Sequence, residues 1–249
     1  QNINNSNILT QNYYFNLLNN LSSSTSDYTN LASNTANGGL GWNPIGDNTN
    51  RFIGIFDGKG FTISNLYINR PSQNNVGLFG YTNNATIKNI GLKDVDITGN
   101  SHAGGLLGYK YGGTISNSYA SGAVSGVIYI GGLVGFNEKG TISNSYATGN
   151  VNGDVFIGGL VGYDHGGTIS NSFYDKTKYT GNGVGNNSTH PGVTGKTTQE
   201  LSYGKIFKDA SWDIVADSSV TSLTPVIKWD SINNKYVWAI APLALTYTL

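Results

Sequence analysis

The chain has 249 residues, 14 basic and 14 acidic side chains, no Cys and no Met. Zero net charge without any Lys/Arg run leaves no basic surface for nucleic acid or an anionic membrane, and the lack of Cys excludes disulfides and thiolate chemistry. Hydrophobic residues (38%) are numerous enough for a packed core. Without a long apolar stretch or a signal-peptide pattern, we expect no membrane insertion and a mature piece or excised fragment of a longer protein.

The N-terminal residues 1–50 are predicted to form a cap with a short helix and lead-in strands. Residues 11–21, QNYYFNLLNNL, follow a possible helix cap at Thr10. Their apolar residues recur at helical spacing, which predicts a helix covering the first coil of the repeat region that follows.

An internal repeat fills residues 51–175. Two motifs, Gly-Leu-x-Gly and Thr-Ile-x-Asn, each recur four times and advance by the same nearly constant step, so two independent landmarks define one period. The positions that mark them are Leu78, Leu106, Leu133 and Leu160 for the first motif, and Ile87, Ile115, Ile142 and Ile169 for the second.

A unit of about 27 residues rich in Ile, Val, Tyr and Thr, with Gly and Asn between short runs, is too short for a propeller blade and has no helical period. It predicts an all-β parallel β-helix with one coil per repeat. The Leu and Ile columns would fill the interior, and the Gly pairs at 104–105, 131–132 and 158–159 would allow positive φ or close backbone approach. A ladder of stacked amides is predicted at Asn89, Asn117, Asn144 and Asn171.

Residues 176–249 are predicted to form a C-terminal cap or small module. Thr197 and Glu200 have the spacing of a capping box, which predicts a helix to about residue 208. Two apolar runs flank Asn233 and Asn234 and predict a hairpin. The apolar final residues, 238–249, would need covering.

The motifs GGLLG, GGLVG and VGLFG resemble the GLUG repeats of filamentous-haemagglutinin-like bacterial exoproteins of the two-partner secretion type. The lead-in GWNPIG and the exit NSFYDKTKYTG are similar to the flanks of those repeats, so the resemblance covers roughly residues 40–215. It implies a right-handed parallel β-helix, a secreted or cell-surface location, and an export partner in the outer membrane. The NPNL-type motif of the secretion domain is absent, which indicates a downstream segment or a smaller relative.

Candidate catalytic groups are few. Asp94 and Asp96 are two residues apart with His102 nearby, but one repeat later the position of Asp96 holds Ala123 and that of His102 holds Tyr129. A second set, Asp154, Asp164 and His165, matches no metal-ligand spacing, and the HExxH pattern of zinc proteases is absent. We therefore expect no catalytic residue, no metal and no cofactor. Asp57, in the sequence FDGKG, is predicted to serve a turn.

Two aromatic columns follow the repeat. The second, Tyr119, Tyr146 and Phe173, is predicted by strand alternation to face the interior of the coil. The first is predicted to point outward or to lie at a corner, where it would either contact a glycan or staple the coil. It consists of Tyr81, Tyr109, Phe136 and Tyr163.

These features predict a non-enzymatic adhesin or exoprotein segment, secreted or on the cell surface. Its expected partner is a host or environmental glycan or a surface protein. Two alternatives are a structural stalk of a larger exoprotein and a carbohydrate-active enzyme, a polysaccharide lyase or hydrolase, on the same fold.

Overall fold

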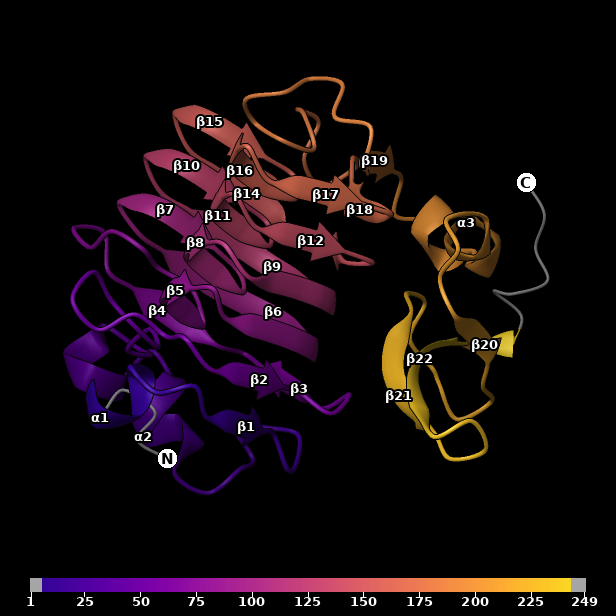
Figure 1. Ribbon diagram of the computed structural model, residues 1–249, viewed down its shortest axis with the longest axis horizontal. Coiled ribbons are helices and arrows are strands. Elements are labelled where there is room, and N and C mark those ends of the chain that lie inside the picture. The colour runs from indigo at the N-terminus through magenta and orange to yellow at the C-terminus, as the bar shows by residue number, and fades with distance from the viewer. Residues whose placement is uncertain (1–5, 243–249) are drawn as a thin grey trace.

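The structure is a computed structural model and describes residues 6–242. It is a solenoid of parallel strands with a smaller module beside it (Figure 1). Each coil passes through three sheets in the order C, B, A. Sheet C contains β7 (Ser101–Gly104), β10 (Ile128–Gly131) and β15 (Val155–Gly158). Sheet B contains β5 (Phe79–Asn83), β8 (Leu107–Tyr111), β11 (Val134–Glu138) and β16 (Val161–His165).

Sheet A runs the whole length of the solenoid and receives strands from every coil. Its first strands are β1 (Tyr14–Asn16), β2 (Ile55–Asp57), β3 (Thr62–Ser64), β4 (Tyr67–Asn69) and β6 (Thr86–Thr98). Its later strands are β9 (Thr114–Ser125), β12 (Thr141–Ser143), β13 (Tyr146–Ala147), β14 (Asn150–Asn152), β17 (Thr168–Ser170), β18 (Ser172–Asp175) and β19 (Val193–Lys196).

The repeat period sets the strand register, as predicted. In sheet A, Ile115 pairs in parallel with Ile87 of the preceding repeat on one side and with Ile142 of the following repeat on the other. The Ile and Leu columns are both buried in the solenoid core, with no member more than 5% exposed. The predicted all-β solenoid with one repeat per coil is therefore confirmed.

The Gly pairs act through close approach rather than through positive φ. A Cβ added at Gly131 would overlap the carbonyl oxygen of Val134, and one added at Gly158 would overlap that of Val161. The chain turns so sharply from sheet C to sheet B that only hydrogen fits there.

The predicted Asn ladder lies at a bend of sheet A. Asn117 Nδ2 donates to Asn89 Oδ1 at 3.3 Å, and Asn89 Nδ2 donates to Asp57 Oδ1 at 3.0 Å. Asn89, Asn117, Asn144 and Asn171 all have positive φ, between 46° and 54°. Asn is one of the few residues that adopt this conformation at low cost, so all four residues bend the strand, while the amide-to-amide hydrogen bond joins Asn117 to Asn89.

This bend overturns the predicted orientation of the second aromatic column. Tyr119 is buried, but on the side of sheet A that the C-terminal module covers, and its neighbour Ala120 faces the solenoid core. Strand alternation predicts which face of the sheet a side chain points to only while φ stays negative along the strand. The left-handed residue Asn117, between the inward Ile115 and Tyr119, shifts the alternation by one.

The predicted helix over residues 11–21 is wrong. Residues Tyr14–Asn16 form β1, which pairs with β2, and the backbone N–H of Leu21 donates to Thr62 O at 2.8 Å. Pairing with the edge of sheet A outweighs a weak helical pattern. Short helices lie around this strand instead: α1 (Ser6–Leu9), α2 (Tyr28–Ala32) and the 3₁₀ segment η1 (Ala36–Gly39).

The C-terminal module follows its predicted elements. Glu200 Oε2 accepts from the Thr197 N–H at 2.7 Å, and Thr197 Oγ1 accepts from the Glu200 N–H at 3.1 Å, which confirms the capping box. The hairpin is confirmed by the antiparallel pairing of β21 (Val226–Asp230) with β22 (Lys235–Ile240). The elements are η2 (Glu200–Ser202), α3 (Gly204–Asp209), β20 (Ile214–Ala216), β21 (Val226–Asp230) and β22 (Lys235–Ile240).

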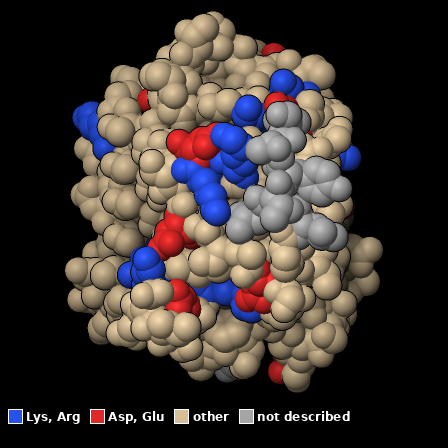
Figure 2. All heavy atoms as spheres, turned by 90° about the vertical axis from the view of Figure 1, so that its right-hand side faces the viewer, with Lys and Arg blue, Asp and Glu red and all other residues tan. Residues whose placement is uncertain are grey.

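Charged side chains gather on the side of the molecule that carries this module, with basic and acidic groups next to one another (Figure 2). Lys235 contacts Asp213 at 2.5 Å and Lys205 contacts Asp209 at 2.6 Å. Within residues 6–242, every ion pair lies either around Asp57 or between residues 176 and 235. Of the predicted apolar end, Trp238 and Ile240 are buried, and residues 243–249 lie outside the described part.

Candidate functional site: an aromatic surface

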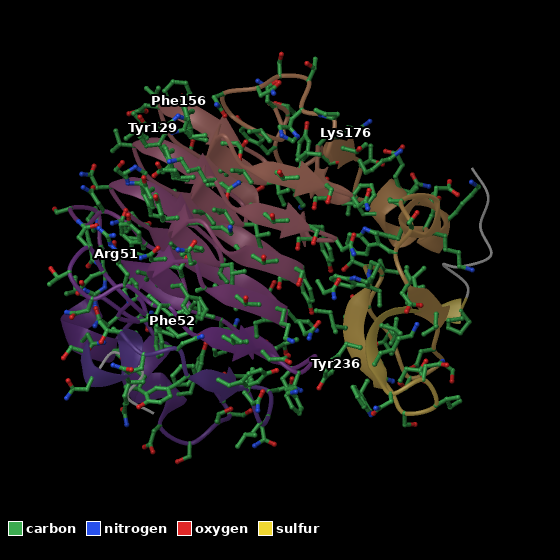
Figure 3. All side chains as sticks on the ribbon, viewed as in Figure 1. Arg51, Phe52, Tyr129, Phe156, Lys176 and Tyr236 are labelled. Carbon is green, nitrogen blue, oxygen red and sulfur yellow. The ribbon has the colours of Figure 1, made fainter. Side chains whose placement is uncertain are left out.

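Two ladders of stacked rings run along the solenoid where sheets B and C meet, and we call them together the aromatic surface. The sheet B ladder is the column predicted from the sequence, Tyr81, Tyr109, Phe136 and Tyr163. The sheet C ladder consists of His102, Tyr129 and Phe156, one from each strand of that sheet. Figure 3 places Tyr129 and Phe156 at the margin of the solenoid away from the C-terminal module.

Within each ladder the rings stack at about the strand spacing. Tyr109 lies 4.8 Å from Phe136, and Tyr129 lies 5.4 Å from Phe156, with interplanar angles of 9° and 6°. Between the ladders the rings meet edge to face, as in Phe156–Tyr163 at 4.9 Å and 89°. Both arrangements are favourable for aromatic quadrupoles, so the two ladders fix one another.

The three residues of the sheet C ladder have a strained backbone conformation. His102, Tyr129 and Phe156 have φ of 56°, 62° and 55°, in the left-handed region. A bulky aromatic residue is uncommon there, whereas Asn or Gly would adopt it at lower cost. The sequence nevertheless places a ring at this position in three successive coils.

The charged groups that contact the ladders of the aromatic surface are Arg51, at the N-terminal end, and Glu138, beside Tyr109. Burial lowers the pKa of His102 to about 4. Burial also raises the pKa of Tyr81, and burial together with Glu138, which accepts a hydrogen bond from the hydroxyl, raises the pKa of Tyr109. Arg51 lies over the Tyr81 ring at 4.6 Å. The surface therefore offers rings and hydroxyl groups.

The C-terminal end of the surface is the most accessible. Phe156 is 36% exposed, and the neighbouring Val127 and Val155 are each 45% exposed. The other rings of the two ladders are half-buried.

The acidic candidates are not assembled into a site. Asp94 and Asp96 are exposed, while the ring of His102 packs among Tyr109, Tyr129 and Phe136. Asp154 and His165 are exposed too. Among the described residues no group of three His, Cys, Asp or Glu side chains could hold a metal ion.

Asp57 serves a turn, as predicted, and is more deeply buried than the sequence indicated. Its Oδ1 accepts from the Lys59 N–H at 2.9 Å, and its Oδ2 accepts from the Tyr14 hydroxyl at 2.9 Å. Burial alone would raise the pKa of Asp57, but hydrogen bonds from Asn89, Lys59 and Tyr14 lower it overall. Asp57 thus anchors the N-terminal end of the Asn ladder.

Two features were missed at the sequence level although the same spacing reveals them. One is the sheet C ladder, whose members are one repeat apart. The other is a polar column directly after the sheet B ladder: Thr82, Lys110, Asn137 and Asp164.

Comparison with known proteins supports the repeat assignment. Residues 99–125 and 126–152 match the GLUG motif. The first match spans β7, β8 and β9, and the second spans the following coil from β10 to β14.

Two curated proteins are similar over part of the chain. A 92-residue stretch is 44% identical to Halomucin of Haloquadratum walsbyi and covers 36% of this chain and 1% of that protein. A 79-residue stretch is 43% identical to a Putative Gly-rich membrane protein of Evansella cellulosilytica and covers 30% of this chain and 9% of that protein. No solved structure matches.

None of the helices in residues 6–242 is long and apolar enough to span a membrane. The resemblance to filamentous-haemagglutinin-like proteins of the two-partner type stays a prediction, since the matches reach only as far as the motif itself. The chain therefore carries GLUG motifs, and each matched motif forms one coil of its parallel β-solenoid.

Proposed function

We propose that this chain is a non-enzymatic segment of an exported or cell-surface protein and that its aromatic surface binds glycans. The observation that carries the proposal is the sheet C ladder, in which three coils hold a ring on left-handed backbone. Strain of about 1–3 kcal/mol per residue is retained where a side chain has a role, because a cheaper residue would otherwise fit.

The chemistry of the aromatic surface suits a sugar. The CH-rich face of a pyranose packs against an aromatic ring, and hydroxyl groups and a Lys or Arg at the rim satisfy its polar groups. Phe156 has a ring stacked on one side only, Tyr129, and is partly exposed. Tyr163 packs perpendicular to it, and the two rings together would form the contact site.

Export to the surface is supported by the relatives. One is named Halomucin and the other is named a Gly-rich membrane protein. A low charge and a stack of identical coils suit a stiff extracellular rod. A glycan or a surface protein is the partner that we propose, and an outer-membrane export partner remains part of this proposal.

The stalk is the second candidate, and one observation favours it. Most ring faces in the ladders are covered by the next ring at 4.6–5.4 Å, which is the arrangement expected of a purely structural staple. The enzyme alternative has less support, since Asp94 and Asp96 are exposed and His102 is packed apart among aromatic rings.

A glycan array tests the proposal. Phe156→Ser removes the exposed ring but keeps the rest of the ladders, and we expect it to lose at least ten-fold in affinity for any glycan that the chain binds. Trp229→Ala is the matched control, because Trp229 is an exposed aromatic residue (49%) in the C-terminal module. If no glycan binds above background, or if both variants bind equally well, the stalk is the better description.

A further inference from the structure

A buried polar column follows the sheet B ladder by one residue. Lys110, Asn137 and Asp164 occupy the same position in three successive coils, paired in register across β8, β11 and β16. Lys110 is 1% exposed and Asn137 is not exposed at all. Since a Lys side chain is almost never fully buried without an acidic partner, this column needs an explanation beyond packing.

The amine of Lys110 is fixed in place by two backbone carbonyl groups. Its Nζ donates to Gly112 O at 2.6 Å and to Gly113 O at 2.7 Å. Burial lowers the pKa of Lys110 to about 7, although the charge of Asp164 opposes this change. A neutral amine has two N–H bonds and one lone pair. With both N–H bonds taken by carbonyl oxygens, the lone pair is free.

The amide of Asn137 lies next to that amine. Its Nδ2 donates to Gly140 O at 3.1 Å and to Asp164 Oδ1 at 2.5 Å. A Cβ added at Gly140 would overlap Lys110 Nζ, so the amine and the amide meet at the same glycine. Asn137 Oδ1 is buried and has no hydrogen-bond partner, which leaves the amide carbonyl unengaged.

We propose that Lys110 and Asn137 form an intramolecular isopeptide bond, with Asp164 as the proton carrier. Lys110 Nζ attacks Asn137 Cγ, and a new C–N bond forms. Forming this bond moves Nζ away from the Gly112 and Gly113 carbonyl groups to the side of Nδ2. There Asp164 takes a proton from Nζ and delivers it to Nδ2, which leaves as ammonia. One amine and one primary amide become one secondary amide and ammonia, so no oxidant, metal or cofactor is required.

Asp164 contacts the leaving nitrogen, Asn137 Nδ2, and makes no ion pair with the Lys110 amine. Its Oδ1 already accepts the hydrogen bond from the leaving nitrogen, and its charge acts on Lys110. Gly167 keeps the space open, because a Cβ there would overlap Asn137 Nδ2. The product would join two consecutive coils covalently, β8 to β11, in a chain that has no Cys for a disulfide.

Peptide mapping of the folded chain tests the bond. Trypsin cleaves after Lys93, Lys110 and Lys139, so an unmodified chain yields residues 94–110 and 111–139 as separate peptides. With the bond, Lys110 resists cleavage, and residues 94–139 appear as one peptide lighter by one ammonia. Loss of ammonia from another Asn or Gln leaves Lys110 cleavable and does not imitate this result.

The wild-type protein alone decides the proposal: two peptides of unmodified mass would overturn it. Two variants then assign the roles. Lys110→Met should give residues 94–139 at full mass, and Asp164→Asn should lose most of the linked peptide. Asp154→Asn, an exposed Asp in the same coil, is the matched control and should keep it. Equal amounts of the bond in the Asp164→Asn variant would overturn the role of Asp164.

Discussion

His102 is the one member of the sheet C ladder, whose other rings are Tyr129 and Phe156, that takes up a proton at acidic pH. Its pKa of about 4 lies below the ordinary value of about 6.5, because the imidazole is packed among Tyr109, Tyr129 and Phe136. Between these two values the unfolded chain binds a proton that the folded chain does not. Stability therefore falls as pH drops from about 6.5 to about 4 and is not reduced further by this group below pH 4.

The variant His102→Tyr should remove this acid sensitivity, because the next coil already carries Tyr129 at the same position with the same backbone. Urea denaturation at pH 7 and pH 4 measures the effect. The wild type should lose about 2 kcal/mol more than the variant on acidification, less than the full value because the ring is partly exposed. An equal loss in both proteins would show that His102 is not the group responsible.

At the same scale, spacing predicts which residues stack but not which way they point. The constant repeat step was sufficient to place the Leu and Ile columns in the core. It was not sufficient for Tyr119, because the positive φ of Asn117 shifts the alternation and φ cannot be derived from a period. The polar column from Lys110 to Asp164 could have been found from the same spacing.

Among the elements, the Gly pairs decide whether a coil can turn from sheet C to sheet B. Gly131→Ala should cost about 3 kcal/mol or more, because the added methyl group meets the backbone of Val134 rather than a flexible side chain. Gly166 is the control. It has φ of 69° with nothing within 4 Å of an added Cβ, so Gly166→Asn should change stability by less than about 0.5 kcal/mol.

Thermal unfolding followed by circular dichroism compares the two glycine variants. A small effect at Gly131 would mean that the turn relaxes, and the steric account of the Gly pairs would then be wrong. A large effect at Gly166 would contradict the claim that this turn is open.

The elements that could be predicted are those fixed by contacts between residues close in the sequence. The capping box at Thr197 and Glu200 and the hairpin around Asn233 depend on contacts within a few residues, and both form as expected. The segment 11–21 depends on a partner far away in the sequence, since Tyr14 pairs with Ile55. Its own sequence has the apolar spacing of a helix, and the pairing with β2 cannot be predicted from these residues alone.

For the whole molecule, the aromatic columns of the solenoid differ in whether the C-terminal module covers them. The column of Tyr119, Tyr146 and Phe173 is covered by the C-terminal module, whereas the aromatic surface has no module over it in the described residues. The covered column shows how the solenoid holds a partner: Tyr146 donates to Pro225 O at 2.7 Å while its ring packs near Trp212 and Trp238. At the aromatic surface, rings could likewise supply contact area for a partner and hydroxyl groups could orient it.

Trp212 lies in the module and packs against the solenoid, so its substitution should separate the two. Its ring packs on Phe207, Trp238 and Phe173, and its Nε1 donates to Asn171 O at 2.7 Å. Trp212→Ala should therefore cost about 3–5 kcal/mol of module docking, expose the Tyr119 column and increase the binding of a hydrophobic dye. The solenoid has its own core of Leu and Ile columns, so its parallel strands should persist.

Limited proteolysis distinguishes release of the module from general unfolding. In the Trp212→Ala variant we expect fast cleavage between residues 197 and 240 and survival of a fragment that contains the repeat region. The exposed Trp229 is again the control, and Trp229→Ala should leave the cleavage pattern unchanged. If the repeat region is digested together with the module, the stacked coils depend on the module for their stability, and the view of the solenoid as a self-sufficient rod fails.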